Sequence, residues 1–214
     1  MDYSRLFLAV APIVILLSTL TSCSVSVPTE PPDYSAAPPE IEDGFYVENT
    51  ESITIDLPLD QFLAWQDKTP LSEVLTPTEG MPAVARTVVL EGGKWGDVGD
   101  RRRIELADGH YAVETILSST RNKFSYQVWG FTSQAGQFAS YATGEFVYTE
   151  QDGQTLVTWT YRFKPNSLIS RIPLSSFVRN SFQKFMENGL SNMKTGAEQA
   201  QSSSIRNHIL NPAA

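Results

Sequence analysis

The chain has 214 residues, 41% of them hydrophobic and 19% charged, which is enough for one domain with a sizeable core. It carries 16 basic and 24 acidic residues, a formal net charge of −8. This excess of acid argues against nucleic acid as a partner, because phosphates need Lys and Arg for neutralisation. It also disfavours adhesion of the surface to anionic lipid headgroups through charge.

The amino terminus has the pattern of a secretory signal. The apolar run from Leu6 to Leu17 is 12 residues long, whereas a spanning helix needs roughly 20. Residues 1–22 therefore fit a signal peptide, with an uncleaved signal anchor as the alternative. Cys23 follows, and it is the only cysteine in the sequence, so it has no intramolecular disulfide partner.

The residues Leu20-Thr21-Ser22-Cys23 resemble the bacterial lipobox, in which small residues precede a cysteine that receives diacylglycerol. The resemblance implies a lipoprotein that is anchored in a membrane through the lipidated Cys23. Because Ser24 is not an aspartate, the resemblance also implies sorting to the outer membrane, facing the periplasm. We therefore expect the protein in the cell envelope, held there by acyl chains.

Three regions follow the signal. Residues 23–49 comprise the lipidated cysteine and an acidic, Pro-rich stretch, which favours an extended spacer with few buried contacts. Residues 50–200 form the predicted domain. Residues 201–214 are polar and end in Asn-Pro-Ala-Ala, so we expect a frayed tail.

Within the domain the pattern is mostly strand. Alternating or continuous apolar residues predict strands at 52–57, 84–91 and 123–132, and residues 60–66 have the spacing of a short helix. The dipeptides Asp108-Gly109 and Asp152-Gly153 predict two hairpins. The recurrence of apolar residues at steps of three and four predicts an amphipathic helix over residues 175–197.

A two-residue turn in each hairpin fixes which residues share a face. In the second hairpin the predicted partners are Phe146 with Trp159, Tyr148 with Val157, and Gly144 with Tyr161. In the first hairpin one face is predicted to hold Ile104, Leu106, Tyr111 and Val113, and the wet face Arg103, Glu105, His110 and Glu114.

Four stretches resemble the START-like (SRPBCC) superfamily of polyketide cyclases and lipid-transfer proteins: Gly99–Gly109, Glu114, Phe124–Tyr126 and Thr158–Pro165. The resemblance implies an α+β helix-grip fold, in which a curved antiparallel sheet wraps around a long carboxy-terminal helix. It also implies a cavity between them that takes an apolar molecule. A lipocalin is the alternative, on the strength of Gly93-Lys94-Trp95, but too few strands follow Trp95 for that barrel.

The predicted ligand-binding residues are Arg102, Tyr126, Phe146, Tyr148, Trp159, Tyr161 and Phe182. Each aromatic residue could instead be ordinary core. Arg102 falls on the apolar side of its strand, where a charge needs a partner, a ligand anion or water. Alternatively the strand starts late or bulges, and Arg102 reaches solvent.

The sequence contains few residues or motifs that indicate catalysis or metal binding. The domain has no zinc-ligand spacing and no Gly-x-Ser-x-Gly elbow. His110 borders a turn and is predicted at the surface, and His208 lies in the polar tail. The glycine cluster at 92–99 lacks dinucleotide-binding spacing and reads as a loop. We therefore predict no catalytic residue, metal or cofactor.

These observations favour a lipid-anchored protein that binds or carries an apolar small molecule or lipid without catalysis. An enzyme of the cyclase or dehydratase type, using a tyrosine or carboxylate in the same cavity, is the first alternative. An assembly partner of other envelope proteins, with a vestigial cavity, is the second.

Overall fold

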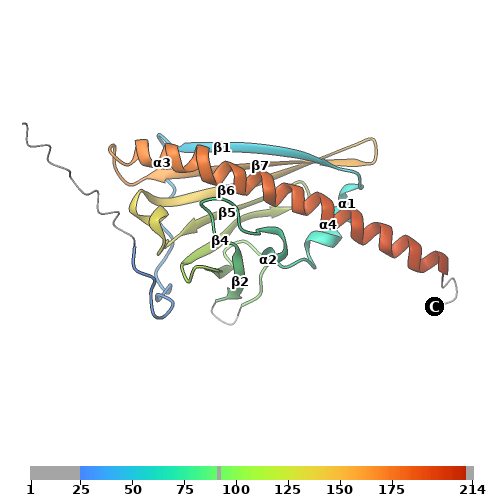
Figure 1. Cartoon of the computed structure of the whole chain (residues 1–214), viewed down its shortest axis with the longest axis horizontal. Helices are drawn as coiled ribbons and strands as arrows, with labels where there is room; N and C mark the ends of the chain where they lie inside the picture. Colours follow the sequence, from blue (N-terminus) through green and yellow to red (C-terminus); the bar gives the residue numbers. More distant parts are fainter. Residues whose placement is uncertain (1–24, 91–92, 211–214) are drawn as a thin grey trace, which may run out of the picture.

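The computed structural model describes residues 25–90 and 93–210, so the predicted signal peptide and Cys23 lie outside the described residues. A sheet and a long carboxy-terminal helix dominate this part of the chain (Figure 1). The elements in chain order are β1 (Val47–Ile55), α1 (Leu59–Gln66), α2 (Leu71–Val74), β2 (Val84–Val89), β3 (Arg101–Leu106), β4 (Tyr111–Thr120), β5 (Lys123–Trp129), the 3₁₀ turn η1 (Gln134–Gln137), β6 (Ala139–Gln151), β7 (Gln154–Pro165), α3 (Arg171–Phe177), the π-helical turn η2 (Val178–Phe182) and α4 (Gln183–Leu210).

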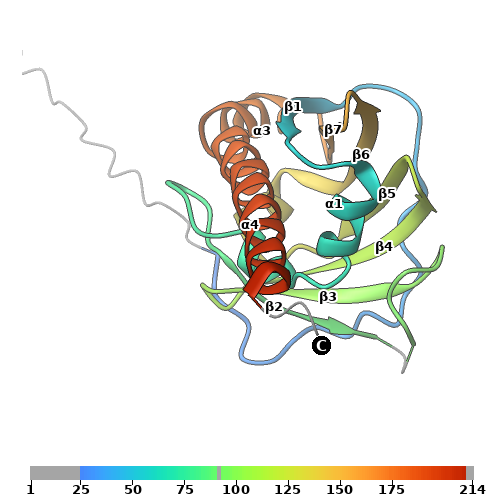
Figure 2. The same ribbon diagram turned by 90° about the vertical axis from the view of Figure 1, so that its right-hand side faces the viewer.

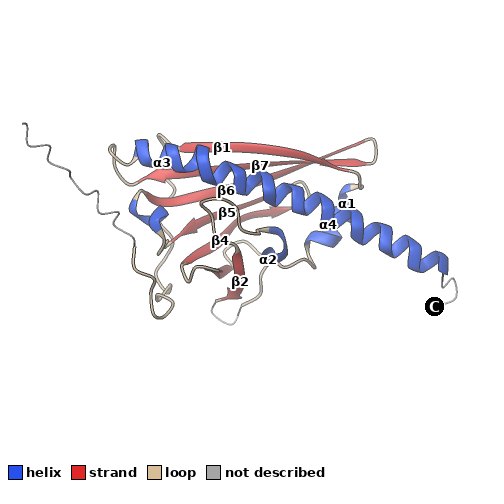
Figure 3. Ribbon diagram, viewed as in Figure 1, coloured by secondary structure: helices blue, strands red, loops and turns tan. Residues whose placement is uncertain are grey.

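The strands of the described chain form one antiparallel sheet in the order β1-β7-β6-β5-β4-β3-β2. Viewed along the final helix, the sheet curls from β1 at the top to β2 at the bottom, and α4 closes the open side (Figure 2). Figure 3 shows the segregation of helix and strand in the view of Figure 1. This is the helix-grip fold that the sequence predicts, and an open sheet that grips a helix excludes the lipocalin alternative.

The second hairpin has the predicted register. Phe146 pairs with Trp159, Tyr148 with Val157 and Gly144 with Tyr161. Its two-residue turn places both Asp152 and Gly153 at positive φ (53° and 77°), as a type I′ turn requires. The strand pair therefore presents its aromatic residues to the core and its polar residues to water.

The first hairpin differs from the prediction by one residue. Leu106 N–H donates to the carbonyl of His110 (2.8 Å), so the loop holds three residues, Ala107 to Gly109, with Gly109 at φ 86°. A three-residue loop that ends in a left-handed glycine is a common hairpin alternative to the two-residue turn. Because side chains alternate, the shift reverses both faces of β4.

The reversal moves His110, Ala112 and Glu114 to the inner face, beside Ile104 and Leu106. Tyr111 and Val113 move to the outer face, where the small apolar cluster also contains Tyr34, Trp129 and Tyr141. The prediction that His110 and Glu114 face water is therefore wrong.

Part of the predicted spacer packs on this outer face. Tyr34 is buried, its ring meets Trp129 edge-to-face at 6.0 Å, and its hydroxyl donates to the carbonyl of Gly130 (3.0 Å). Gln127 donates to the carbonyl of Pro39 (2.8 Å) and Arg101 donates to the carbonyl of Tyr34 (3.2 Å). The expectation of few buried contacts is wrong here, because an apolar outer face needs a cover.

The carboxy-terminal helical run is longer than predicted. It begins at Arg171 instead of residue 175, passes through η2, and continues to Leu210, so residues 201–210 are helical and not a frayed tail. Within the described residues no helix combines the length and apolar character needed to cross a membrane.

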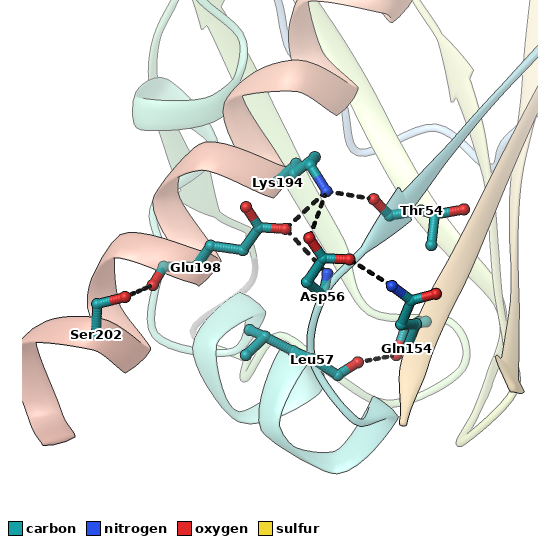
Figure 4. Close-up of polar contacts among 8 residues, drawn as sticks. Thr54, Asp56, Leu57, Gln154, Lys194, Glu198 and Ser202 are labelled. Carbon is teal, nitrogen blue, oxygen red and sulfur yellow. Dashed lines mark hydrogen bonds and ion pairs between the residues drawn. The ribbon is translucent and has the colours of Figure 1, made fainter. Parts of the chain in front are cut away.

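Polar contacts hold α4 against the end of β1 (Figure 4). Lys194 Nζ donates to the carbonyl of Thr54 (2.7 Å) and pairs with Glu198 (2.8 Å). The carboxylate of Glu198 also accepts from the backbone N–H of Asp56 (2.9 Å), whose carboxylate accepts from Gln154 (2.6 Å). Exposed pairs of this kind contribute about 0.2–1 kcal/mol each, so the buried apolar face of the helix provides most of the attachment.

Candidate functional site

A cavity of about 830 Å³ lies between the inner face of the sheet and the helical run α3–η2–α4. Its wall includes six of the seven predicted ligand-binding residues: Arg102, Tyr126, Phe146, Trp159, Tyr161 and Phe182. Tyr148 is not among the lining residues. Its ring packs against Phe62 at 5.9 Å and its hydroxyl lies within hydrogen-bond distance of Gln66, so it belongs to the core beneath α1.

The aromatic wall is built by alternate residues of β5, β6 and β7. Phe146 and Trp159 face each other across β6 and β7 and stack with ring centres 4.9 Å apart. Tyr161 meets Phe182 from η2 at 4.6 Å. A side chain at Gly144 would overlap the Tyr126 ring, so the glycine lets this ring lie across β6.

The tyrosine hydroxyls in the wall are hydrogen-bond donors. Tyr126 Oη accepts from Trp159 Nε1 (3.0 Å), and burial raises the pKa of Tyr126 well above its usual range. Burial, and then the carboxylate of Glu114, also raise the pKa of Tyr161 far above its usual range. Both phenols therefore keep their protons at neutral pH and can donate to a carbonyl or hydroxyl oxygen.

Arg102 lies on the inner face and has an internal partner. Its Nε donates to Glu114 Oε2 (2.6 Å), directly across the strand pair β3–β4. The two side chains are only 14% and 3% exposed, respectively. Trp95, from the predicted glycine-rich loop, covers the guanidinium, with Cζ 3.9 Å from its ring centre. Strand β3 begins at Arg101, so Arg102 lies within the strand. The positive charge of Arg102 is balanced by Glu114, without a ligand anion.

His110 also lines the cavity, contrary to the predicted surface position. It is buried, and its Nδ1 lies 3.1 Å from Thr132 Oγ1. The misplacement follows directly from the one-residue error in the first hairpin. Gly109 in the third position of the loop was the available signal for a three-residue loop. The dipeptide Asp108-Gly109 is compatible with a two-residue loop as well, so it did not decide between them.

Residues of the connections and of α3 complete the wall, and those in the connections lie outside any periodic pattern of the sequence. They come from the amino-terminal segment, the α2–β2 connection, the β5–β6 connection and α3, and include Val25, Met81, Phe131, Phe138, Pro173 and Phe177. We refer to this part of the wall as the mouth. In residues 25–90 and 93–210, no group of three or more His, Cys, Asp or Glu side chains is arranged to hold a metal ion.

Residues 47–198 match the family described as polyketide cyclase / dehydrase and lipid transport. The chain belongs to this family. The match spans all seven strands of the sheet and most of α4, so it covers the whole cavity-forming unit. No curated protein matches the sequence.

Solved structures share the fold. The crystal structure of Ara h 8.0201 has a TM-score of 0.57 at 15% identity, over 72% of this chain and 99% of that chain. The Zhui aromatase/cyclase of a Streptomyces species has a TM-score of 0.56 at 13% identity, over 72% and 95%. The di-domain ARO/CYC StfQ has a TM-score of 0.55 at 13% identity, over 73% of this chain and 52% of that chain. Likeness at these identities shows the fold alone.

Proposed function

We propose that this family member binds or carries an apolar small molecule or lipid in the cavity between the sheet and the carboxy-terminal helix. The observation that carries the proposal is the cavity itself, whose volume of about 830 Å³ is walled mainly by aromatic and aliphatic side chains. Ligand pockets typically have volumes of about 300–1,000 Å³ and an apolar lining with a few placed polar groups.

The polar groups indicate which head group the ligand carries. Tyr126 and Tyr161 are protonated donors, and the Arg102–Glu114 pair is neutral as a unit. A free anionic head would meet the carboxylate of Glu114 as well as the guanidinium. A mainly apolar ligand with one uncharged carbonyl or hydroxyl group fits this set better.

A second candidate is cyclase or dehydratase chemistry in the same cavity. It is favoured by a carboxylate and an imidazole, Glu114 and His110, on the inner face. The Zhui protein, which shares the fold, is named an aromatase/cyclase. Against it, raised pKa values keep Tyr126 and Tyr161 protonated at neutral pH, so neither phenolate is available as a base, and Glu114 is engaged by Arg102. Binding without catalysis therefore remains the primary proposal.

The proposed location is the cell envelope, with the lipidated Cys23 in the outer membrane and the domain facing the periplasm. Support comes from the signal-like residues 1–22 and from the lipobox resemblance of residues 20–23.

Titration with N-phenylnaphthylamine, an uncharged fluorescent apolar probe, tests the binding proposal. We expect saturable fluorescence enhancement with the full-length protein. Ala112→Phe should abolish it, because Ala112 lines the cavity, whereas the matched Val147→Phe should not, because Val147 is an exposed residue of β6. Equal melting temperatures establish that both variants are folded. Absence of saturable binding, or equal binding by the two variants, would contradict the proposal.

A further inference from the structure

The connection between β7 and α3, together with the first turn of α3, exposes three large apolar side chains. Leu168, Ile169 and Ile172 are 73%, 86% and 80% exposed, more than any other large hydrophobic residue that the structure describes. Single exposed apolar residues are common, but three in five residues form a patch that needs a partner. We refer to these three residues as the apolar patch.

The turn that carries the apolar patch is held by its own hydrogen bonds. Ser170 Oγ donates to Asn166 Oδ1 (2.5 Å) and lies 2.8 Å from Ser167 Oγ, and the backbone N–H of Ser170 donates to Ser167 Oγ (3.2 Å). Ser170 is buried in this turn, whereas Asn166, Ser167, Leu168 and Ile169 are all exposed. The hydrogen bonds thus hold Leu168 and Ile169 in a defined, solvent-exposed position.

The sequence around the apolar patch is basic: residues 162–186 contain five basic residues and no acidic one, although the chain has a net charge of −8. Three of the five form ion pairs with acidic residues of other segments, namely Arg162 with Glu48, Lys164 with Glu42 and Lys184 with Glu79. Arg171 is the basic residue within the patch itself. Arg171 lies between Ile169 and Ile172 and stacks on the exposed ring of Phe45, with Cζ 4.3 Å from the ring centre. Apolar side chains flanked by basic ones match the interface of a bilayer with anionic headgroups.

The apolar patch also adjoins the mouth of the cavity and the start of the described chain. Pro173 and Phe177, which follow it on α3, line the cavity, and so does Val25. Cys23 is two residues before Val25, and two residues span about 7 Å at most. Figure 1 shows α3 and the first described residues at the same end of the molecule, opposite the end of α4.

We propose that the apolar patch is a membrane-docking surface. Leu168, Ile169 and Ile172 enter the headgroup region of a lipid bilayer, Arg171 contacts anionic headgroups, and the mouth of the cavity is thereby held against the membrane. The passage of a ligand between the bilayer and the cavity rests on the proposed binding function. The docking of the apolar patch on the bilayer does not depend on that function.

The test places a fluorophore on the apolar patch. Full-length protein, processed by its host and purified from membranes, is reconstituted into phosphatidylcholine vesicles that contain phosphatidylglycerol. Ile169→Cys carries a thiol-linked, environment-sensitive fluorophore. Val98→Cys is the matched control, because Val98 is also an exposed aliphatic residue (65%). Val98 lies before β3, whereas Val27, near the start of the described chain, contacts Gly109 in the turn after β3. The unsubstituted chain gives the background labelling of Cys23.

We expect the emission of the residue 169 probe to shift to the blue, and its quenching by aqueous iodide to fall several-fold, relative to the residue 98 probe in the same vesicles. The anchor at Cys23 could by itself hold residue 169 nearer to the bilayer than residue 98, so the decisive comparison is with a variant that keeps the anchor and changes only the patch. Adding Ile172→Asp to the Ile169→Cys chain should remove the shift. The melting temperature should not change, because Ile172 is exposed.

Equal emission and equal quenching at residues 169 and 98 would overturn the docking proposal. A blue shift that appears only as the protein density on the vesicles rises would assign the patch to contacts between copies of the chain, and would also overturn it. A protein that docks but does not bind N-phenylnaphthylamine would refute the binding function and leave the docking surface intact.

Discussion

Replacing Arg102 by methionine should destabilise the protein more than replacing Arg102 and Glu114 together. The Glu114 carboxylate is 3% exposed and its Oε2 lies 2.6 Å from Arg102 Nε. Arg102→Met leaves this charge buried without its partner, which typically costs about 3–5 kcal/mol of unfolding free energy. Adding Glu114→Gln removes the unpaired charge, so the double variant should recover at least about 2 kcal/mol of that loss.

Urea denaturation followed by tryptophan fluorescence measures these free energies, provided that the dependence on urea is the same in all variants. Arg86→Met is the matched control, because Arg86 pairs with Glu105 over the same 2.6 Å but is 68% exposed. An exposed pair contributes about 0–1 kcal/mol, so this control should stay near the wild type. If Arg102→Met lowers the free energy of unfolding no more than Arg86→Met does, water must solvate the Glu114 carboxylate. The inference that Glu114 is buried and depends on Arg102 would then be refuted.

Three further predictions concern other parts of the chain. Cys23→Ser should abolish incorporation of a labelled fatty acid, because the proposed lipidation needs the thiol of Cys23 as the acceptor. Label retained on the serine variant would refute the lipoprotein prediction. Tyr34→Ala should lower the free energy of unfolding, measured in urea, by on the order of 3 kcal/mol, because the Tyr34 ring is buried against Trp129. Tyr34→Phe should lower it by about 1 kcal/mol, because only the hydrogen bond from the hydroxyl to the carbonyl of Gly130 is lost. No loss in either would show that residues 25–46 are a loose spacer. Gly144→Ala should cost about 1–3 kcal/mol and weaken binding of N-phenylnaphthylamine, because the new Cβ displaces the Tyr126 ring; unchanged stability and binding would mean that the ring has room to move.

The parts of the fold that the sequence predicted are those with a strong local period or an unambiguous turn. Asp152-Gly153 fixed the register of β6 and β7, and with it the placement of Phe146, Trp159 and Tyr161 on one face. The stripe of apolar residues after Pro173 predicted the helix that covers this face. Together these two elements supply the aromatic side of the cavity wall and the helix that covers it.

The failures have local physical causes. Asp108-Gly109 fits a two-residue and a three-residue loop, and the choice between them reverses the faces of β4, including His110 and Glu114. The cover formed by Tyr34 follows from the apolar outer face of the sheet, which is a tertiary property without a signal in the Pro-rich segment itself.

Whether the cavity holds an apolar molecule is tested most directly by native mass spectrometry of the full-length protein purified from its own host. We predict a non-covalent adduct of about one molecule per chain that is lost on gas-phase activation, and that is absent from Ala112→Phe, in which a ring occupies the cavity. The extracted adduct should be largely apolar, with an uncharged polar group. Bare protein, or the same adduct on the wild type and on Ala112→Phe, would contradict the account.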